Sequence, residues 1–363
     1  MARGASQDAD GTRAEGAPRV AAPAAPAGAL RAAWARLPRW LRELVRLAAL
    51  MLATSVLAFA LVGLSPVDPV EANLGQVALA SMSEEKLAEL ESYWGSDTPI
   101  WERYLAWLGS ALTGDLGTSL RYNAPVVEVI AERALGSLAL MAVAWVVSGT
   151  LGLLLGIAAG ARQGTALDRG ICAYCYLISS TPTFWLALLL LMVFAVWLGW
   201  FPTGFSVPIG VAAEDVTLAD RAYHLVLPAL ALSVTGVANV ALHTREKVVD
   251  VLASDYARFA RLRGETPAQV LRRHGLRNLV VPAIMLQFSQ ISEIFGGSVL
   301  VEQVFSYPGL GQAAVTAGLG GDAPLLVGIA LFSAAIVWAG NLAATLLAEA
   351  VDPRLREGAV AHA

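Results

Sequence analysis

The sequence predicts an all-α polytopic membrane protein with six transmembrane helices. Hydrophobic residues make up 56% of its 363 residues and charged residues only 15%, whereas an average soluble domain has about 25% charged residues. The charges are also clustered, because none occurs at 47–67, 134–161, 170–213, 222–244 or 323–348. Each stretch reaches the roughly 20 residues that cross a hydrocarbon core. The pattern excludes a soluble enzyme, a nucleic-acid-binding protein, a disordered chain and a disulfide scaffold, and it favours helices over a β-barrel.

The N-terminal 43 residues are expected to lie before the first span. Residues 1–30 are rich in Ala, Pro, Gly and Asp without periodicity, which predicts a disordered tail. From 31 to 46 arginines alternate with Trp and Leu, a pattern typical of a basic amphipathic helix on a membrane surface.

The six predicted spans and their orientation follow from the charge-free stretches and the arginines. We expect spans at 44–64, 135–160, 171–198, 224–243, 280–301 and 324–348. Twenty of the 25 basic residues lie in the N-terminal region, the 161–169 loop, the 244–279 loop and the 349–363 tail. The positive-inside rule places these segments in the cytoplasm and 65–134 outside. A seven-span alternative would divide 170–213, but Pro and Gly residues between 202 and 210 indicate a loop there.

Small residues and prolines inside the spans predict how the helices pack. Gly152, Gly156 and Gly160 recur every four residues, which allows a second helix to approach closely. Pro182, Pro228 and Pro282 fall inside three later spans and predict kinks. A bundle with several kinks is more typical of a transporter than of a simple membrane anchor.

The cytoplasmic loop at 244–279 carries the strongest local signals. We expect a helix over 246–263, and Gly264 suits the left-handed position after its end. Thr266 and Gln269 form a capping box, and Pro267 fits the first position of a second helix. A capped helical pair facing the cytosol favours a docking element for a motor protein, although a basic loop lying on anionic lipid remains an alternative.

Motifs in this loop and elsewhere resemble one protein family. The segment 255–264, followed by 273–278, resembles the EAA coupling loop of binding-protein-dependent ABC importer permeases, in particular the first permease subunit of the dipeptide, oligopeptide and nickel group. Further segments match that group in the same order, at 64–69, 99–119, 301–311 and 351–354. One departure is that Arg258-Phe259-Ala260 stands where the family has Glu-Ala-Ala.

The resemblance implies a type I ABC importer permease (MetI-like) fold in a bacterial cytoplasmic membrane. It implies a second homologous permease subunit, two ATPase domains and an external substrate-binding protein as partners, with the substrate crossing between the permeases. The chain itself has no GxxxxGK[ST] phosphate loop, so we expect it to bind no cofactor, with ATP and Mg²⁺ held by the partner ATPases. The residues expected to couple to an ATPase are Asp255, Tyr256, Arg258, Phe259, Ala260, Arg261, Arg263, Gly264, Arg273, His274 and Arg277. Among these, Tyr256, Phe259 and Ala260 are expected to supply apolar contact.

Two further groups of residues are singled out. Glu293 is an acid inside a span, which is costly and usually marks a cavity or a partner contact. It is a candidate for the translocation path or gate together with Gln290, Asn239 and Asn341; the alternative is that these residues form structural hydrogen bonds. The external signature turn holds Glu302, Phe305, Pro308 and Gly309, and Glu302 is interpreted as structural.

Two other classes of protein are alternatives to a permease. An ion-gradient-driven secondary transporter would need charged coupling sites in several spans. In this sequence Glu293 is the only clear candidate for such a site. A membrane-anchored enzyme would need a catalytic or metal constellation, but the four His residues are scattered and predict no metal site. Within the resembling group, peptides are the expected cargo, with nickel chelates or other small solutes as alternatives.

Overall fold

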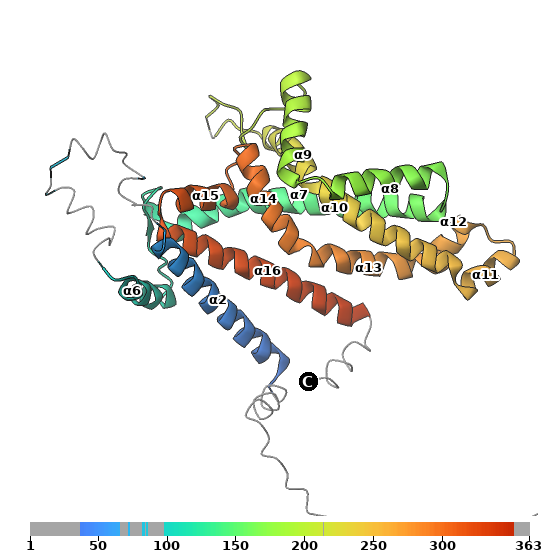
Figure 1. Cartoon of the computed structure of the whole chain (residues 1–363), viewed down its shortest axis with the longest axis horizontal. Coiled ribbons are helices and arrows are strands. Elements are labelled where there is room, and N and C mark those ends of the chain that lie inside the picture. The colour runs from blue at the N-terminus through green and yellow to red at the C-terminus, as the bar shows by residue number, and fades with distance from the viewer. Residues whose placement is uncertain are drawn as a thin grey trace, which may run out of the picture.

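The protein is described by a computed structural model over residues 37–65, 98–212 and 214–351, with single positions at 72, 82, 83 and 85. The predicted tail at 1–30 and most of the 349–363 tail lie outside the described residues. The described chain is almost entirely helical (Figure 1). Its elements are α2 (Arg39–Gly63), α6 (Ile100–Leu112), β1 (Thr118–Ser119), β2 (Ala124–Pro125), α7 (Val126–Ala161), α8 (Ala166–Ser179), α9 (Thr183–Leu190), the π-helical η1 (Leu191–Trp197), α10 (Leu218–Ala253), α11 (Asp255–Leu262), α12 (Pro267–Val270), the π-helical η2 (Leu271–Gly275), α13 (Leu276–Ser289), α14 (Ile291–Val304), α15 (Leu310–Leu319) and α16 (Ala323–Val351).

Four to six stretches of the described chain have the length and composition of membrane spans. Helices α2, α7, α10 and α16 are each long and apolar enough to cross alone, and two bent pairs, α8 with α9–η1 and α13 with α14, can each cross once. Both α7 and α10 run for 36 residues, well past the predicted 135–160 and 224–243. The predicted spans were shorter than these helices because a stretch without charged residues marks only the part of a helix that lies in lipid. Helix α2 likewise begins at Arg39, so the second half of the expected amphipathic segment is continuous with the first span.

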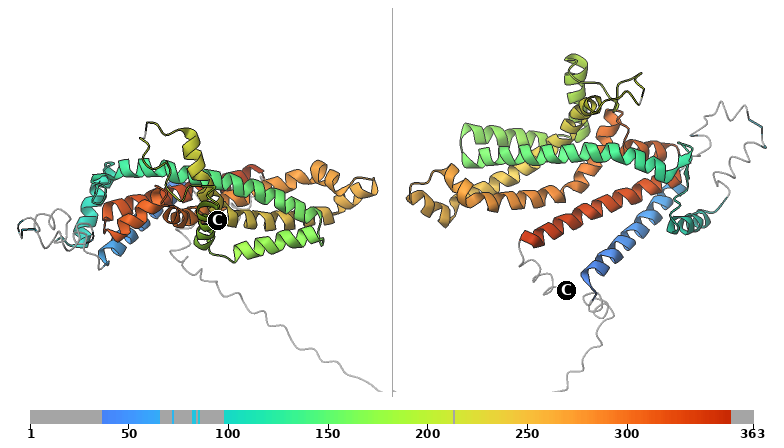
Figure 2. Two further views of the ribbon diagram at one scale, coloured as in Figure 1. Left: turned by 90° about the horizontal axis from the view of Figure 1, so that it is seen from above. Right: turned by 180° about the vertical axis from the view of Figure 1, so that it is seen from behind.

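The longest helices, α7 and α10, pack along each other as the predicted glycine stripe requires. Gly152, Gly156 and Gly160 all face α10. At Gly156 a Cβ atom would lie 2.6 Å from the carbonyl oxygen of Ala241 and 2.5 Å from Cβ of Thr244, so the two backbones are nearly in contact. The views in Figures 1 and 2 show α7, α8 and α10 lying lengthwise side by side.

Two apolar helix pairs are sharply bent where their helices join. The axis turns by 106° between α8 and α9 and by 51° between α13 and α14. Pro182 precedes α9 as its N-cap, which agrees with the predicted kink. Pro228 and Pro282 instead lie within α10 and α13, and the bend of the fifth span falls at Gln290 rather than at Pro282.

Helices α2 and α16 form a separate layer beside the main bundle (Figure 2). Arg39 at the start of α2 pairs with Glu349 near the end of α16. At the other end of α2, Phe59 contacts the rings of Tyr104 and Trp107 of α6. The aromatic residues of α6 therefore attach this helix to α2.

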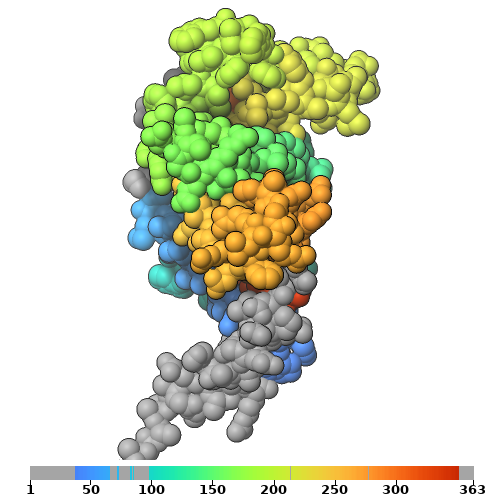
Figure 3. All heavy atoms as spheres, turned by 90° about the vertical axis from the view of Figure 1, so that its right-hand side faces the viewer, coloured from blue at the N-terminus to red at the C-terminus, as the bar shows by residue number. Residues whose placement is uncertain are grey.

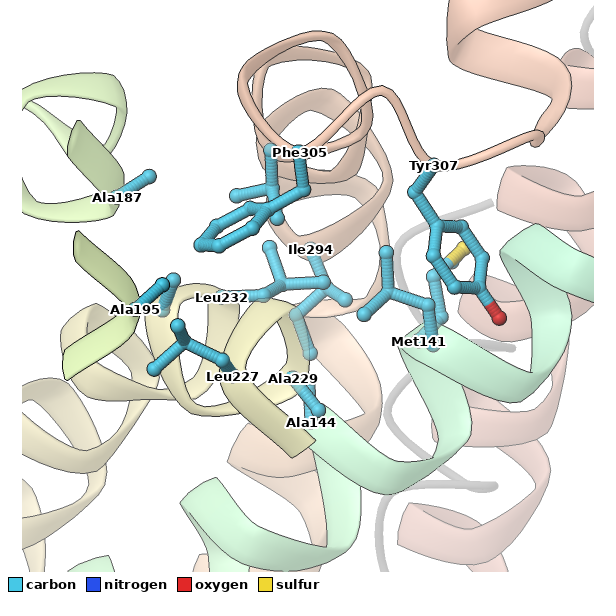
Figure 4. Packing of buried hydrophobic residues seen from close by; sticks show 13 residues of the cluster. Met141, Ala144, Ala187, Ala195, Leu227, Ala229, Leu232, Ile294, Phe305 and Tyr307 are labelled. Carbon is cyan, nitrogen blue, oxygen red and sulfur yellow. The ribbon is translucent and has the colours of Figure 1, made fainter. Parts of the chain in front are cut away.

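The main core lies where α7, α9, α10 and α14 meet. Leu140, Leu227 and Leu232 are almost fully buried there. Figure 4 shows Phe305 and Tyr307 reaching into this cluster from the turn after α14. The core thus holds the turn after α14 against α7 and α10.

Candidate functional site

The cytoplasmic loop of the prediction forms a compact helical projection made of α11, α12 and η2. It lies at one end of the molecule, opposite α6 and α15 (Figure 1). The expected single helix over 246–263 is wrong, because α10 continues to Ala253 and α11 starts after a break at Ser254. Ser254 caps α11 by accepting from Ala257 N at 3.4 Å, a local bond that competes with continuing the helix.

The corner of the projection follows the predicted cap signals. Gly264 has φ +88°, in the left-handed region that glycine adopts without strain. Thr266 Oγ1 accepts from Gln269 N, and Gln269 Oε1 accepts from Thr266 N, with Pro267 at the start of α12. This reciprocal capping box fixes the direction in which α12 leaves the corner.

A small apolar core holds the projection together. Ala257, Ala260 and Val270 are buried against one another and against Leu252 at the end of α10. Ala260 was expected to offer surface for docking, but it is only 7% exposed. Its small side chain instead lets α11 lie against α12.

The outer face of α11 carries three exposed large apolar side chains. Tyr256, Phe259 and Leu262 follow at intervals of three residues and are 43%, 64% and 80% exposed. Leu262 was missed from sequence, although its spacing from Phe259 places it on the same helix face. Figure 3 views the molecule from this end, where the projection forms the orange surface at the centre.

The basic residues of the projection divide into exposed and internally bonded groups. Arg258 and Arg263 are exposed beside the apolar stripe, and Asp255 is exposed in the first turn of α11. Arg261 donates to the carbonyl oxygen of Leu252 at 3.0 Å.

A second set of polar contacts crosses the Gly264 corner. Arg273 and His274 lie 3.7 and 3.3 Å from the carboxylate of Glu265. Arg277 belongs to α13, but its side chain lies outside the described atoms. The polar groups therefore stiffen the corner as well as charge its surface.

At mid-length of the bundle, three of the four predicted path residues come together. Asn239 Nδ2 lies 3.5 Å from Glu293 Oε1, and Gln290 lines the same small pocket as Glu293. Glu293 is exposed on the first turn of α14, whereas Gln290 is 8% exposed. Asn341 is exposed on α16 and is not among the residues that line this pocket.

The external turn is organised by a fully buried carboxylate. Glu302 accepts from Ser137 Oγ at 2.6 Å, Gly311 N at 2.7 Å and Gln312 N at 3.1 Å, which matches its structural interpretation. The two amide groups belong to the N-terminal turn of α15, where a negative charge is favoured. Burial and the Glu302 carboxylate raise the pKa of Tyr307.

The other turn residues lie around this carboxylate. Phe305 is buried, and its carbonyl oxygen accepts from Phe205 N at 2.9 Å. Gly309 leaves room for the Glu302 carboxylate, since a Cβ atom there would lie 2.4 Å from Glu302 Oε2. The carbonyl oxygen of the adjacent Pro308 faces Gly136 of α7. The signature turn is thus packed against α7 and α15.

Two buried polar contacts between helices were missed from sequence. Arg245 of α10 binds both carboxylate oxygens of Asp168 of α8, at 2.5 and 2.8 Å. Gln287 of α13 donates to Trp145 O and to Ser148 Oγ of α7. The partners lie 77 and about 140 residues apart in the chain, so no local spacing indicates them.

The apolar spans, the mid-length polar pocket and the folded projection at one end define a multi-pass membrane transport protein. Comparisons with known proteins agree with this assignment to membrane transport proteins. Residues 152–357 match the family described as "Binding-protein-dependent transport system inner membrane component", and the chain belongs to this family.

Three curated relatives are similar over most of their length. The oligopeptide transport system permease protein AppB of Bacillus subtilis is 35% identical over 84% of this chain and 95% of its own. The di/tripeptide transport system permease protein DppB of Pseudomonas aeruginosa is 33% identical over 83% and 94%. The dipeptide transport system permease protein DppB of Escherichia coli is 30% identical over 87% and 98%.

Proposed function

We propose that this chain is a permease subunit of an ATP-driven importer for peptides or closely related small solutes. It forms half of the translocation path and binds no nucleotide itself. The names of the relatives support peptides as the cargo. The observation that carries coupling to an ATPase is the projection of α11 and α12, a rigid corner with an exposed apolar stripe and the exposed arginines Arg258 and Arg263.

The partners that complete the importer are a second homologous permease, two ATPase domains and an external binding protein. The ATPases hold ATP and Mg²⁺. Tyr256, Phe259 and Leu262 supply apolar contact to one ATPase, and Arg258 and Arg263 supply charge complementarity. Since α11 follows α10 after a break of one residue, closure of the ATPase pair pulls directly on the fourth span and, through η2 and α13, on the fifth.

The proposed orientation puts both termini and the projection in the cytoplasm, with six spans in a bacterial cytoplasmic membrane. The support is the charge distribution, with 20 of 25 basic residues in the segments assigned to the cytoplasm. Each bent pair then counts as one span.

The test is uptake by the complete complex in liposomes. Labelled dipeptide should accumulate only when ATP is supplied on the side of the ATPases and loaded binding protein on the other. A proton or sodium gradient without ATP should drive no uptake. Uptake that follows an ion gradient and ignores ATP contradicts the proposal and favours a secondary transporter.

A further inference from the structure

Two bent helix pairs and the unbroken helix α10 meet at one place, where each contributes a polar residue. Thr183 is the first residue of α9, directly after the 106° break, and Gln290 stands at the 51° break between α13 and α14. Thr235 lies at the middle of α10. Interrupted helices that meet at mid-depth in membrane proteins line cavities, because irregular backbone is not stable against lipid.

A pocket of about 30 Å³ lies where these positions meet. Its polar lining consists of Thr183, Thr235, Gln290 and Glu293, and none of the residues that line it is basic. That volume admits one small polar group, since a single water needs roughly 10–15 Å³ by the same measure. The pocket is therefore too small for a whole solute but fits one functional group of a solute.

The hydrogen-bond acceptors in the pocket favour a positively charged hydrogen-bond donor as its ligand. Gln290 Oε1 is buried and has no hydrogen-bond partner within the described part of the chain. The Glu293 carboxylate beside it has one long contact, from Asn239 Nδ2 at 3.5 Å. A buried acceptor without a donor costs free energy, and a group with several N–H donors and a positive charge would satisfy both Gln290 and Glu293. A primary ammonium group has three such donors.

We propose that this pocket binds the α-ammonium group of a peptide during transport. The inference rests on the proposed function, because it takes a peptide to be the cargo. Every free peptide carries this ammonium whatever its side chains, so one acceptor site serves many sequences. Glu293 supplies the charge, and Gln290 supplies the second acceptor.

The experiment compares a labelled dipeptide with its N-acetylated form in the liposome assay. Both are supplied at concentrations that saturate the binding protein, so that selection by the binding protein does not set the rate. Wild type, Glu293→Gln, Glu293→Asp and a control, Glu132→Gln, are measured. Glu132 is an exposed acid near the start of α7 and does not line the pocket.

Wild type should transport the free-amine dipeptide about tenfold faster than the acetylated one, as expected for loss of one charge-assisted contact. Glu293→Gln should slow the free-amine dipeptide about tenfold and abolish the preference, with ATPase stimulation by loaded binding protein unchanged. Glu293→Asp should retain most of the preference, and Glu132→Gln all of it.

Equal rates for the two peptides in wild type overturn the pocket assignment without any variant. The pocket assignment is also overturned if the Glu293→Gln complex keeps the wild-type ratio between the transport rates of the free-amine and acetylated dipeptides. This holds whether both transport rates fall or neither does. Failure of wild type to transport either peptide with ATP contradicts the proposed function instead.

Discussion

Glu302 illustrates how one side chain fixes a turn that the sequence shows only as a motif. Its carboxylate is fully buried and receives bonds from Ser137 and from two amides of α15. The position of a Glu beside an aromatic and Gly-rich turn favoured a structural role. Its partner Ser137 could not be predicted, since it lies 165 residues away.

Replacing Glu302 should destabilise the external turn. Glu302→Leu leaves the Ser137 hydroxyl and two amides without their acceptor, and we expect a loss of about 3 kcal/mol in the free energy of unfolding. Thermal unfolding in detergent measures this. Glu132→Gln, which removes an exposed carboxylate, should unfold as wild type does, and an unchanged unfolding temperature for Glu302→Leu would refute the role.

Gly264 is the residue on which the direction of α12 depends. Gly264→Val places a β-branched residue at φ +88°, where even an ordinary side chain costs about 1–2 kcal/mol. Relief of this strain should turn α11 away from α12, so transport and ATPase stimulation should fall about tenfold while membrane insertion is unchanged.

The matched control for Gly264→Val is Gly114→Val. Gly114 has a similar φ of +94° and equally open surroundings, but it lies just after α6, at the opposite end of the molecule from α11. Normal transport by the Gly264→Val complex would show that the corner does not determine coupling.

At the scale of elements, the sequence predicted which segments are helices better than where they break. The glycine stripe on α7 identified a close contact because spacing alone shows which residues share a face. The break at Ser254 was missed because a single serine inside a helical pattern does not indicate whether it caps or continues the helix. The bend at Gln290 was missed because Pro282, a strong local signal, lies inside a helix that tertiary contacts support.

Contact between α7 and α10 should depend on the absence of side chains in the stripe. Gly156→Leu forces a side chain into the carbonyl oxygen of Ala241 and the side chain of Thr244. We expect a loss of about 2 kcal/mol in stability, measured by thermal unfolding in detergent. The control is Gly170→Leu on α8, where a Cβ atom meets no neighbouring atom within 4 Å; equal unfolding temperatures for the two variants contradict this packing.

At the scale of the whole molecule, composition predicted the class of fold because lipid imposes one strong constraint on every span. Which spans lie side by side was not predicted, because the Asp168–Arg245 and Gln287–Trp145 contacts join distant parts of the chain. For the same reason the sequence proposed four path residues, whereas the fold places Gln290 and Glu293 in one pocket, brings Asn239 within 3.5 Å of Glu293, and leaves Asn341 outside that pocket.

The orientation of the molecule can be tested by labelling single cysteines. Leu262 at the end of α11 and Trp101 on α6 are 80% and 63% exposed, and the helices α11 and α6 lie at opposite ends of the molecule (Figure 1). In whole cells, a membrane-impermeant maleimide should label Trp101→Cys before lysis and Leu262→Cys only after lysis. The control replaces Cys172 and Cys175 with Ala, and labelling of both sites before lysis contradicts the proposed orientation.

The continuous α10 also determines how a movement is scaled within the membrane. Its 36 residues form one rod of about 54 Å, braced along α7 and held near its external end by the buried turn. A rod that pivots at one end moves its midpoint half as far as its free end. Thr235 lies at the midpoint of α10, so in the proposed importer the pocket there would experience a reduced stroke with a correspondingly increased force. In the proposed importer, a large displacement at the ATPase would thereby become a small, strong one at this pocket.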